Sequence, residues 1–162
     1  MPYPDLDSLT NPAASDPRVG HALLHSDINE ALRYGVRKAT VTLSSADILA
    51  LDSTPVTIIA APGAGKWLVP HQVTLAVDFA TTPYVNGDNW PGLYYAGPGP
   101  QIKALDILSQ ASSARSMESP TVGADATNTD DVAIVAGYGS PSTDGDSALT
   151  VIVWYSIEDS PA

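Results

Sequence analysis

A glycine-lysine stretch is the first candidate for chemistry in this sequence. Gly63, Gly65 and Lys66 lie in APGAGKW, which superficially resembles a phosphate-binding loop. That loop needs an earlier glycine at a set spacing and a Ser or Thr after the lysine to hold magnesium. The earlier glycine is missing here and Trp67 follows the lysine. We therefore interpret the stretch as a hairpin turn and predict no nucleotide site.

The histidines are the second candidates. His21 and His25 are four residues apart, the spacing of a metal-binding pair on a helix. Their segment lacks a convincing helical pattern and no third ligand is evident, so we interpret them as surface residues. His71 follows Pro70 in a strand-like stretch, where we expect it to satisfy a hydrogen bond.

Acidic residues gather in the loop-like stretches of the second half, at Asp125, Asp130, Asp131, Asp144 and Asp146. Calcium binds oxygen ligands from flexible loops, which makes a calcium site one alternative. However, Asp-Gly-Asp is also an ordinary turn sequence, and the spacing of an EF-hand is absent. Our expectation is that the chain binds no metal and no cofactor.

Catalysis finds little support in the residue pattern. A glycosidase needs two carboxylates across a cleft, whereas Glu30, Glu118 and Glu158 fall in separate stretches of the chain. Serine hydrolase chemistry would require a nucleophile-elbow sequence, which does not occur. We predict that the chain has no catalytic residues and is not an enzyme.

Aromatic residues offer a binding function instead. Trp67, Trp90, Tyr94 and Tyr95 could form a surface on which sugars stack. The other interpretation, which we favour, places Trp67 in the core and the loop from Trp90 to Tyr95 at a contact between subunits.

Composition narrows the class of protein. The chain has 162 residues, of which 44% are hydrophobic, enough for one domain with a real core. Only 15% are charged, and 18 acidic against 7 basic residues leave a net charge of −11. Such a surface repels nucleic acid and anionic lipid, so we expect neither as a partner.

Cysteine is absent. No apolar run reaches the roughly 18 residues of a membrane span, and the first residues lack the features of a secretory signal, which predicts synthesis in a cytoplasm.

The first 38 residues are predicted to form an extended N-terminal arm with a short helix. Pro2, Pro4, Pro12 and Pro17 prevent a long helix at the start, whereas Ser26 or Asp27 can cap a short one that ends near Gly35. The arm is either a frayed tail or a docking segment that becomes ordered against a neighbour. In the second case its isolated apolar residues are candidate anchors on a partner, together with two aromatics further along the chain: Tyr3, Leu6, Leu9, Ile28, Leu32, Tyr34, Trp90 and Tyr94.

Residues 39–162 are predicted to form a β-domain. Ser44 and Asp47 have the spacing of a capping box for one helical turn, with Ile48, Leu49 and Leu51 pointing inward. Short apolar or alternating stretches predict strands: 40–43, 55–61, 66–69, 72–79, 93–95, 132–136 and 149–157. Helix and strand compete over 102–108, and the polar stretches 109–131 and 137–147 are interpreted as loops.

Many short strands separated by Gly and Pro turns are typical of an all-β fold. The chain contains 12 glycines and 14 prolines and lacks long runs of Ala, Glu, Lys and Leu. We predict a jelly-roll-like β-sandwich with an N-terminal arm and one or two short helices.

Three stretches carry a resemblance to a known group of proteins. They are TVTLSSADILALDSTPVTIIAAPGAGKWLVP, QVTLAVDFATTPYVNGDN and STDGDSALTVIVWYSIED, and the match spans roughly residues 39–157. In this order they resemble virion proteins of tailed bacteriophages, and the first stretch is the most specific. The chain departs from that group in its N-terminal 38 residues and around Trp90-Pro91-Gly92, where an alternating strand is expected.

The resemblance implies a virion structural protein made in the host cytoplasm. Jelly-roll proteins of similar size decorate or cement capsids as trimers, which implies a homotrimer that binds the major capsid protein or another virion protein. A tail-associated module that binds carbohydrate or a receptor is the alternative.

Overall fold

The computed structural model describes residues 35–86, 89–97, 100–120, 130–140 and 142–159. Contacts divide the chain into two compact units, Met1–Gly35 and Val36–Ala162, and the description below concerns the second. The helix expected after Ser26 lies outside the described residues.

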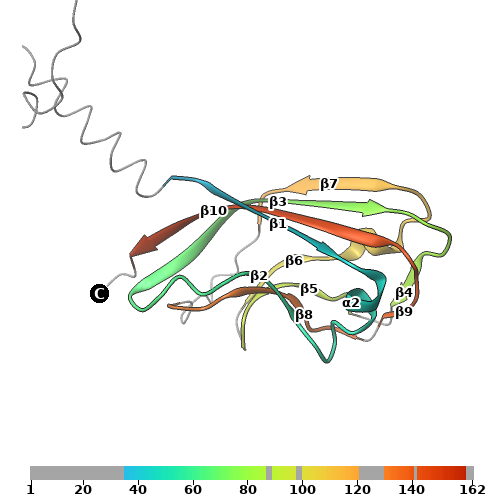
Figure 1. The fold of residues 1–162 in the computed structure, drawn as a ribbon, viewed down its shortest axis with the longest axis horizontal. Helices are drawn as coiled ribbons and strands as arrows, with labels where there is room; N and C mark the ends of the chain where they lie inside the picture. Colours follow the sequence, from blue (N-terminus) through green and yellow to red (C-terminus); the bar gives the residue numbers. More distant parts are fainter. Residues whose placement is uncertain (1–34, 87–88, 98–99, 121–129, 141, 160–162) are drawn as a thin grey trace, which may run out of the picture. The chain divides into compact units, whose positions relative to one another are not determined.

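Two four-stranded antiparallel sheets form a β-sandwich (Figure 1). The first sheet contains, in spatial order, β1 (Arg37–Leu43), β10 (Ala148–Asp159), β3 (Lys66–Asp78) and β7 (Ala114–Glu118). The second contains β2 (Val56–Ile59), β8 (Ile134–Gly137), β5 (Gly92–Tyr95) and β6 (Gln101–Ala104). Two very short strands, β4 (Tyr84–Asn86) and β9 (Ser142–Asp144), pair with each other, and two short helices, α2 (Ser45–Leu49) and the 3-10 helix η2 (Asp106–Ser109), complete the described elements. The predicted all-β sandwich is confirmed.

The strand pairs of the two four-stranded sheets are nested along the chain. The outermost pair is β1 with β10, followed inward by β2 with β8, β3 with β7 and β5 with β6. Successive pairs alternate between the two sheets, and the pairs β10–β3 and β8–β5 complete each sheet. The chain is therefore arranged like one long antiparallel hairpin wrapped around a common core.

The core lies between the sheets because one face of each strand is apolar. On β10, Leu149, Val151 and Val153 are fully buried, as the alternation over 149–157 predicts. Side chains of both sheets fill the space between them, among them Leu43, Leu75, Leu93, Tyr95 and Ile134. The Tyr95 hydroxyl donates a 2.6 Å hydrogen bond from the second sheet to the Leu68 carbonyl of the first.

The capping box at the start of α2 is confirmed. The Asp47 amide donates to Ser44 Oγ at 3.2 Å and the Ser44 amide donates to Asp47 Oδ2 at 2.9 Å. Ile48 and Leu51 are buried, but Leu49 is 38% exposed, so its predicted inward orientation is wrong. In a helix of 3.6 residues per turn, successive side chains point about 100° apart, so with Ile48 and Leu51 toward the core Leu49 turns toward solvent.

The hairpin predicted around Gly63 and Gly65 is also wrong. The strands on either side, β2 and β3, belong to different sheets, so this turn carries the chain from one layer to the other. Both glycines have positive φ, 104° and 73°, which other residues rarely adopt. The amide of Gly63 donates to Asp131 Oδ1 at 2.8 Å, which holds the turn against the segment before β8.

A single strand replaces two that were expected separately. The stretches 66–69 and 72–79 form one 13-residue strand, β3, which runs through Pro70. Pro70 pairs with Tyr155 and Gln72 with Trp154, so His71 is the extra residue of a bulge. A bulge tolerates proline inside a sheet because the regular hydrogen bonding is already interrupted there.

Two strands lie in polar stretches that the sequence predicts to be loops. The stretch 109–131, expected as a loop, contains β7, which pairs with β3 from Ala114 to Glu118. The expected loop 137–147 contains β9. In the stretch where helix and strand competed, both occur: β6 ends at Ala104 and η2 follows.

Candidate functional site

The residues proposed as partner anchors lie in different places. Tyr3, Leu6, Leu9, Ile28, Leu32 and Tyr34 are outside the described residues. Trp90 is half-buried and packs against the core. Tyr94 lies on β5, where its ring meets Tyr138 edge to face with centroids 5.3 Å apart. Tyr95 is fully buried, so its expected place in a subunit contact is wrong.

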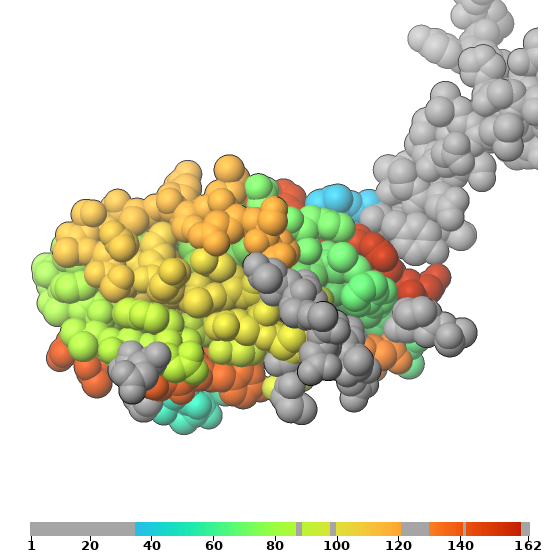
Figure 2. Space-filling model, turned by 180° about the vertical axis from the view of Figure 1, so that it is seen from behind, coloured from blue at the N-terminus to red at the C-terminus, as the bar shows by residue number. Residues whose placement is uncertain are grey.

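Trp90 contributes to an open groove beside η2 and β7. Its volume is about 410 Å³, and its walls mix apolar and polar side chains: Trp90, Asp106, Ile107, Ser109, Gln110, Ala114, Arg115, Ser116 and Glu118. Figure 2 shows this side of the domain, where the light-orange segment that contains β7 lies beside the yellow segment that contains β6 and η2. Tyr94 is not among the residues that line this groove, so the groove does not contain both aromatics.

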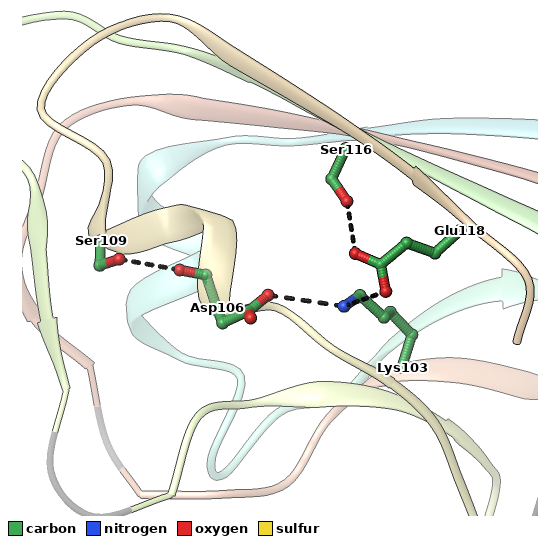
Figure 3. Close-up of polar contacts among 5 residues, drawn as sticks. All are labelled: Lys103, Asp106, Ser109, Ser116 and Glu118. Atoms are coloured by element: carbon green, nitrogen blue, oxygen red, sulfur yellow. Dashed lines mark hydrogen bonds and ion pairs between the residues drawn. The ribbon is translucent and has the colours of Figure 1, made fainter. Parts of the chain in front are cut away.

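Lys103 links the two sheets next to this groove (Figure 3). Its Nζ lies 2.8 Å from Glu118 Oε2 on β7 and 3.7 Å from Asp106 Oδ1 on η2. Ser116 Oγ donates to Glu118 Oε1 at 2.7 Å. Hydrogen bonds from Lys103 and Ser116 lower the pKa of Glu118, because they stabilise its ionised form. The lysine side chain is only 15% exposed. We call the contacts of Lys103 with Glu118 and Asp106 the clamp, because they join β6 and β7, the edge strands of the two sheets.

Replacing this lysine tests the clamp. We expect Lys103→Met to raise the pKa of Glu118 towards its ordinary value, and to lower the free energy of unfolding by about 1 kcal/mol. Carboxyl NMR titration and urea unfolding measure the two effects. Lys66→Met is the control, because the Lys66–Asp159 pair is much more exposed. An unchanged Glu118 pKa in Lys103→Met contradicts the clamp.

Asp146, one of the candidate calcium ligands, stabilises a turn. Its carboxylate accepts hydrogen bonds from the amides of Thr81 and Thr82 at 3.0 and 2.9 Å, and from the Thr81 hydroxyl. These bonds, led by that of the Thr81 hydroxyl, lower the pKa of Asp146. The Asp-Gly-Asp stretch thus joins the loop after β3 to the loop before β10.

The remaining candidate ligands are dispersed. Asp131 binds the Gly63 turn, and Asp125, His21 and His25 lie outside the described residues. His71 Nε2 lies 2.9 Å from Ser156 Oγ, so its expected hydrogen bond is confirmed. Within the described ranges, His, Asp and Glu form no group of three placed to hold a metal. In the same ranges, no helix has the length and apolar character to cross a bilayer.

Comparison with known proteins finds a distant structural likeness. No protein-family model matches the chain, and no curated protein matches it. Among solved structures, a chain of the cyanophage Pam1 capsid asymmetric unit is similar over 75% of this chain and 84% of its own length. The identity is 17% and the TM-score 0.42. A similarity of this size says nothing by itself about what the chain binds.

Proposed function

We propose that this chain is a structural protein of a tailed-phage virion and, more specifically, a capsid decoration protein that stabilises the shell between major capsid subunits. The observation that carries the proposal is spatial. The third stretch that resembles phage virion proteins is distant in the sequence from the first two, which only His71 separates. Its strand β10 nevertheless pairs with β1 of the first stretch and with β3, which the first two stretches share. The third stretch also caps the Thr-Thr-Pro turn of the second through Asp146. The resemblance therefore covers one connected structural unit.

The strand order supports the proposal. Nested antiparallel pairs that alternate between two sheets match the jelly roll, an eight-stranded arrangement used by viral capsid domains and also by lectins. We infer that the domain is a jelly roll. Since one fold hosts many functions, the resemblance to virion proteins and not the fold decides between these classes.

A decoration role agrees with the physical character of the chain. Such a protein needs a rigid body and repeated contacts and no reactive group, so we propose that it is not an enzyme. The space between its sheets is filled by apolar side chains. A net charge of −11 keeps decorated particles apart in solution and disfavours nucleic acid as a partner. The proposed partners are the major capsid protein and other copies of the chain, which we expect to form a homotrimer.

Particle binding tests this function. Purified chain added to phage particles that lack it is expected to bind at many equivalent positions on the shell. Deletion of residues 1–25 should weaken this binding at least about tenfold, since the arm carries the proposed anchors, and leave the melting temperature of the domain almost unchanged. Electron microscopy and co-sedimentation measure the two effects. Binding only at the tail, or full binding by the truncated chain, contradicts the decoration role.

The alternative is a tail-associated module that binds carbohydrate or a receptor. One observation favours it: Trp90 lines an open groove beside Asp106, Gln110 and Glu118, a combination of aromatic and polar groups suited to a sugar. A glycan array separates the two functions. Specific glycan binding that Trp90→Ala abolishes supports the alternative, whereas capsid binding without glycan binding supports decoration.

A further inference from the structure

The free edges of the two sheets differ in how well they are protected against further strand pairing. β2 and β6 have only four residues each, their pairings contain register shifts, and Pro55 precedes β2. β7 carries charged Arg115 and Glu118. Short length, irregular register, proline and charge are the usual means by which proteins prevent sheets from joining at their edges. These three edges are therefore blocked.

β1 lacks these protective features over most of its length. It pairs with β10 over seven residues without a register shift, and it has no other neighbour among the described strands. From Ala39 to Leu43 it contains no charge and no proline, and Val36, just before it, is 63% exposed. Ala39 and Val41 point into the core, whereas Thr40 is exposed on the outer face. A regular, uncharged edge strand of this kind is a template for another strand.

We propose that β1 pairs antiparallel with β1 of a second copy about a twofold axis at Thr40, so that two four-stranded sheets become one continuous sheet. Thr40 is the central residue of β1. With Thr40 opposite itself, Ala39 faces Val41 and Lys38 faces Thr42, so no like charges meet. Opposed threonines on an exposed face favour pairing. The side-chain alternation is preserved, which leaves the apolar residues of both strands on the core side.

The distribution of charge favours a second copy of the chain as the partner that pairs with the edge of β1. At a net charge of −11, copies repel each other over most of their surface, but residues 35–46 contain no acid and include Arg37 and Lys38. In the proposed register the two Arg37 residues lie six positions apart along the strands, roughly 20 Å at about 3.4 Å per residue. That separation exceeds the screening length of about 8 Å in physiological salt, so their mutual repulsion is small.

This twofold contact does not depend on the decoration role. It adds to any threefold contact, because a contact across a twofold axis links two monomers or two trimers equally well. Failure of the pairing would leave the proposed function intact, and failure of capsid binding would leave the pairing intact.

Substitutions at the self-opposed residue test the proposal on the full chain. In wild-type protein, sedimentation velocity should reveal an assembly with an even number of copies. Thr40→Lys places two lysines opposite each other. It should raise the dissociation constant of the twofold contact about tenfold or more and so halve the observed mass. Thr40→Glu should behave in the same way. Mixing the two variants should restore the wild-type mass, because lysine then faces glutamate.

Thr57→Lys is the matched control, since it adds the same charge at an exposed position of β2, a blocked edge. Its mass should equal that of the wild type, and circular dichroism should show all variants folded. A wild-type assembly that Thr40→Lys leaves unchanged, or two variants that fail to restore each other, overturns the proposal. So does exchange protection, independent of protein concentration, of those β1 amides that do not face β10, because the edge would then be covered within one chain.

Discussion

Gly145→Ala should lower the free energy of unfolding by about 3 kcal/mol and the melting temperature by roughly 10 °C. Gly145 has a φ of 65°, and a Cβ at this position would lie 2.1 Å from Cδ1 of Tyr84. That tyrosine is almost fully buried and donates a 2.6 Å hydrogen bond to the Ser147 carbonyl. The ring is therefore held at both ends and cannot move aside, so the turn itself must distort.

Gly97→Ala provides the control for backbone strain alone. Gly97 has a similar positive φ of 84°, but a Cβ there meets no atom within 4 Å. It should cost only about 1 kcal/mol, the strain of a left-handed conformation for a residue with a side chain. Thermal unfolding of both variants at one pH measures the difference. Equal losses would show that the contact with Tyr84 does not constrain the turn.

Alkaline solution should destabilise the domain by about 4 kcal/mol between pH 10 and pH 12. Burial raises the pKa of Tyr95 from its ordinary value near 10 to about 12. Burial, together with the charge of Asp146, raises that of Tyr84 to about 12 as well. In the unfolded chain both tyrosines lose their protons near pH 10, whereas the folded chain retains them. Stability from these groups is thus complete below pH 10 and lost as pH rises through 12, about 3 kcal/mol for each tyrosine.

Tyr95→Phe separates this effect from general alkaline unfolding. At neutral pH the variant should be less stable by about 1 to 2 kcal/mol, because the buried Leu68 carbonyl loses its hydrogen bond. It should also lose about 2 kcal/mol less between pH 10 and pH 12, so its stability curve should cross that of the wild type near pH 11. Urea unfolding at a series of pH values measures both curves. Parallel curves that never meet would contradict the assignment to Tyr95.

Sequence reasoning predicted those parts of the fold that depend on neighbouring residues. The strands around Val73 and Val151 were evident because each alternates between a core face and an outer face, and that period is a local property. The capping box from Ser44 to Asp47 spans three residues, so its geometry is set before any tertiary contact forms. The resemblance linked the C-terminal stretch to two stretches near the start of the domain, but it contained no information about which strands lie side by side.

Candidate chemistry was harder to judge from spacing. Asp146 was considered as a metal ligand, yet its carboxylate accepts hydrogen bonds from Thr81 and Thr82, more than sixty positions earlier in the chain. The sequence contains no signal for the role of Lys103, because its partner Glu118 lies on β7, in a polar stretch that is interpreted as a loop. Neither contact has a local signature, since each forms only when remote segments are brought together.

By itself, the sequence determined the all-β class, the apolar faces of β3 and β10, the short capped helix α2 and the acidic surface. These follow from composition and from periodicity over a few residues, which the backbone enforces locally. Only the tertiary structure decided that the Gly63 turn crosses between sheets, that β7 is a strand and that β1 has a single neighbour, β10, among the described strands. Each of those features depends on which strands become neighbours, and that choice is made by packing the whole core.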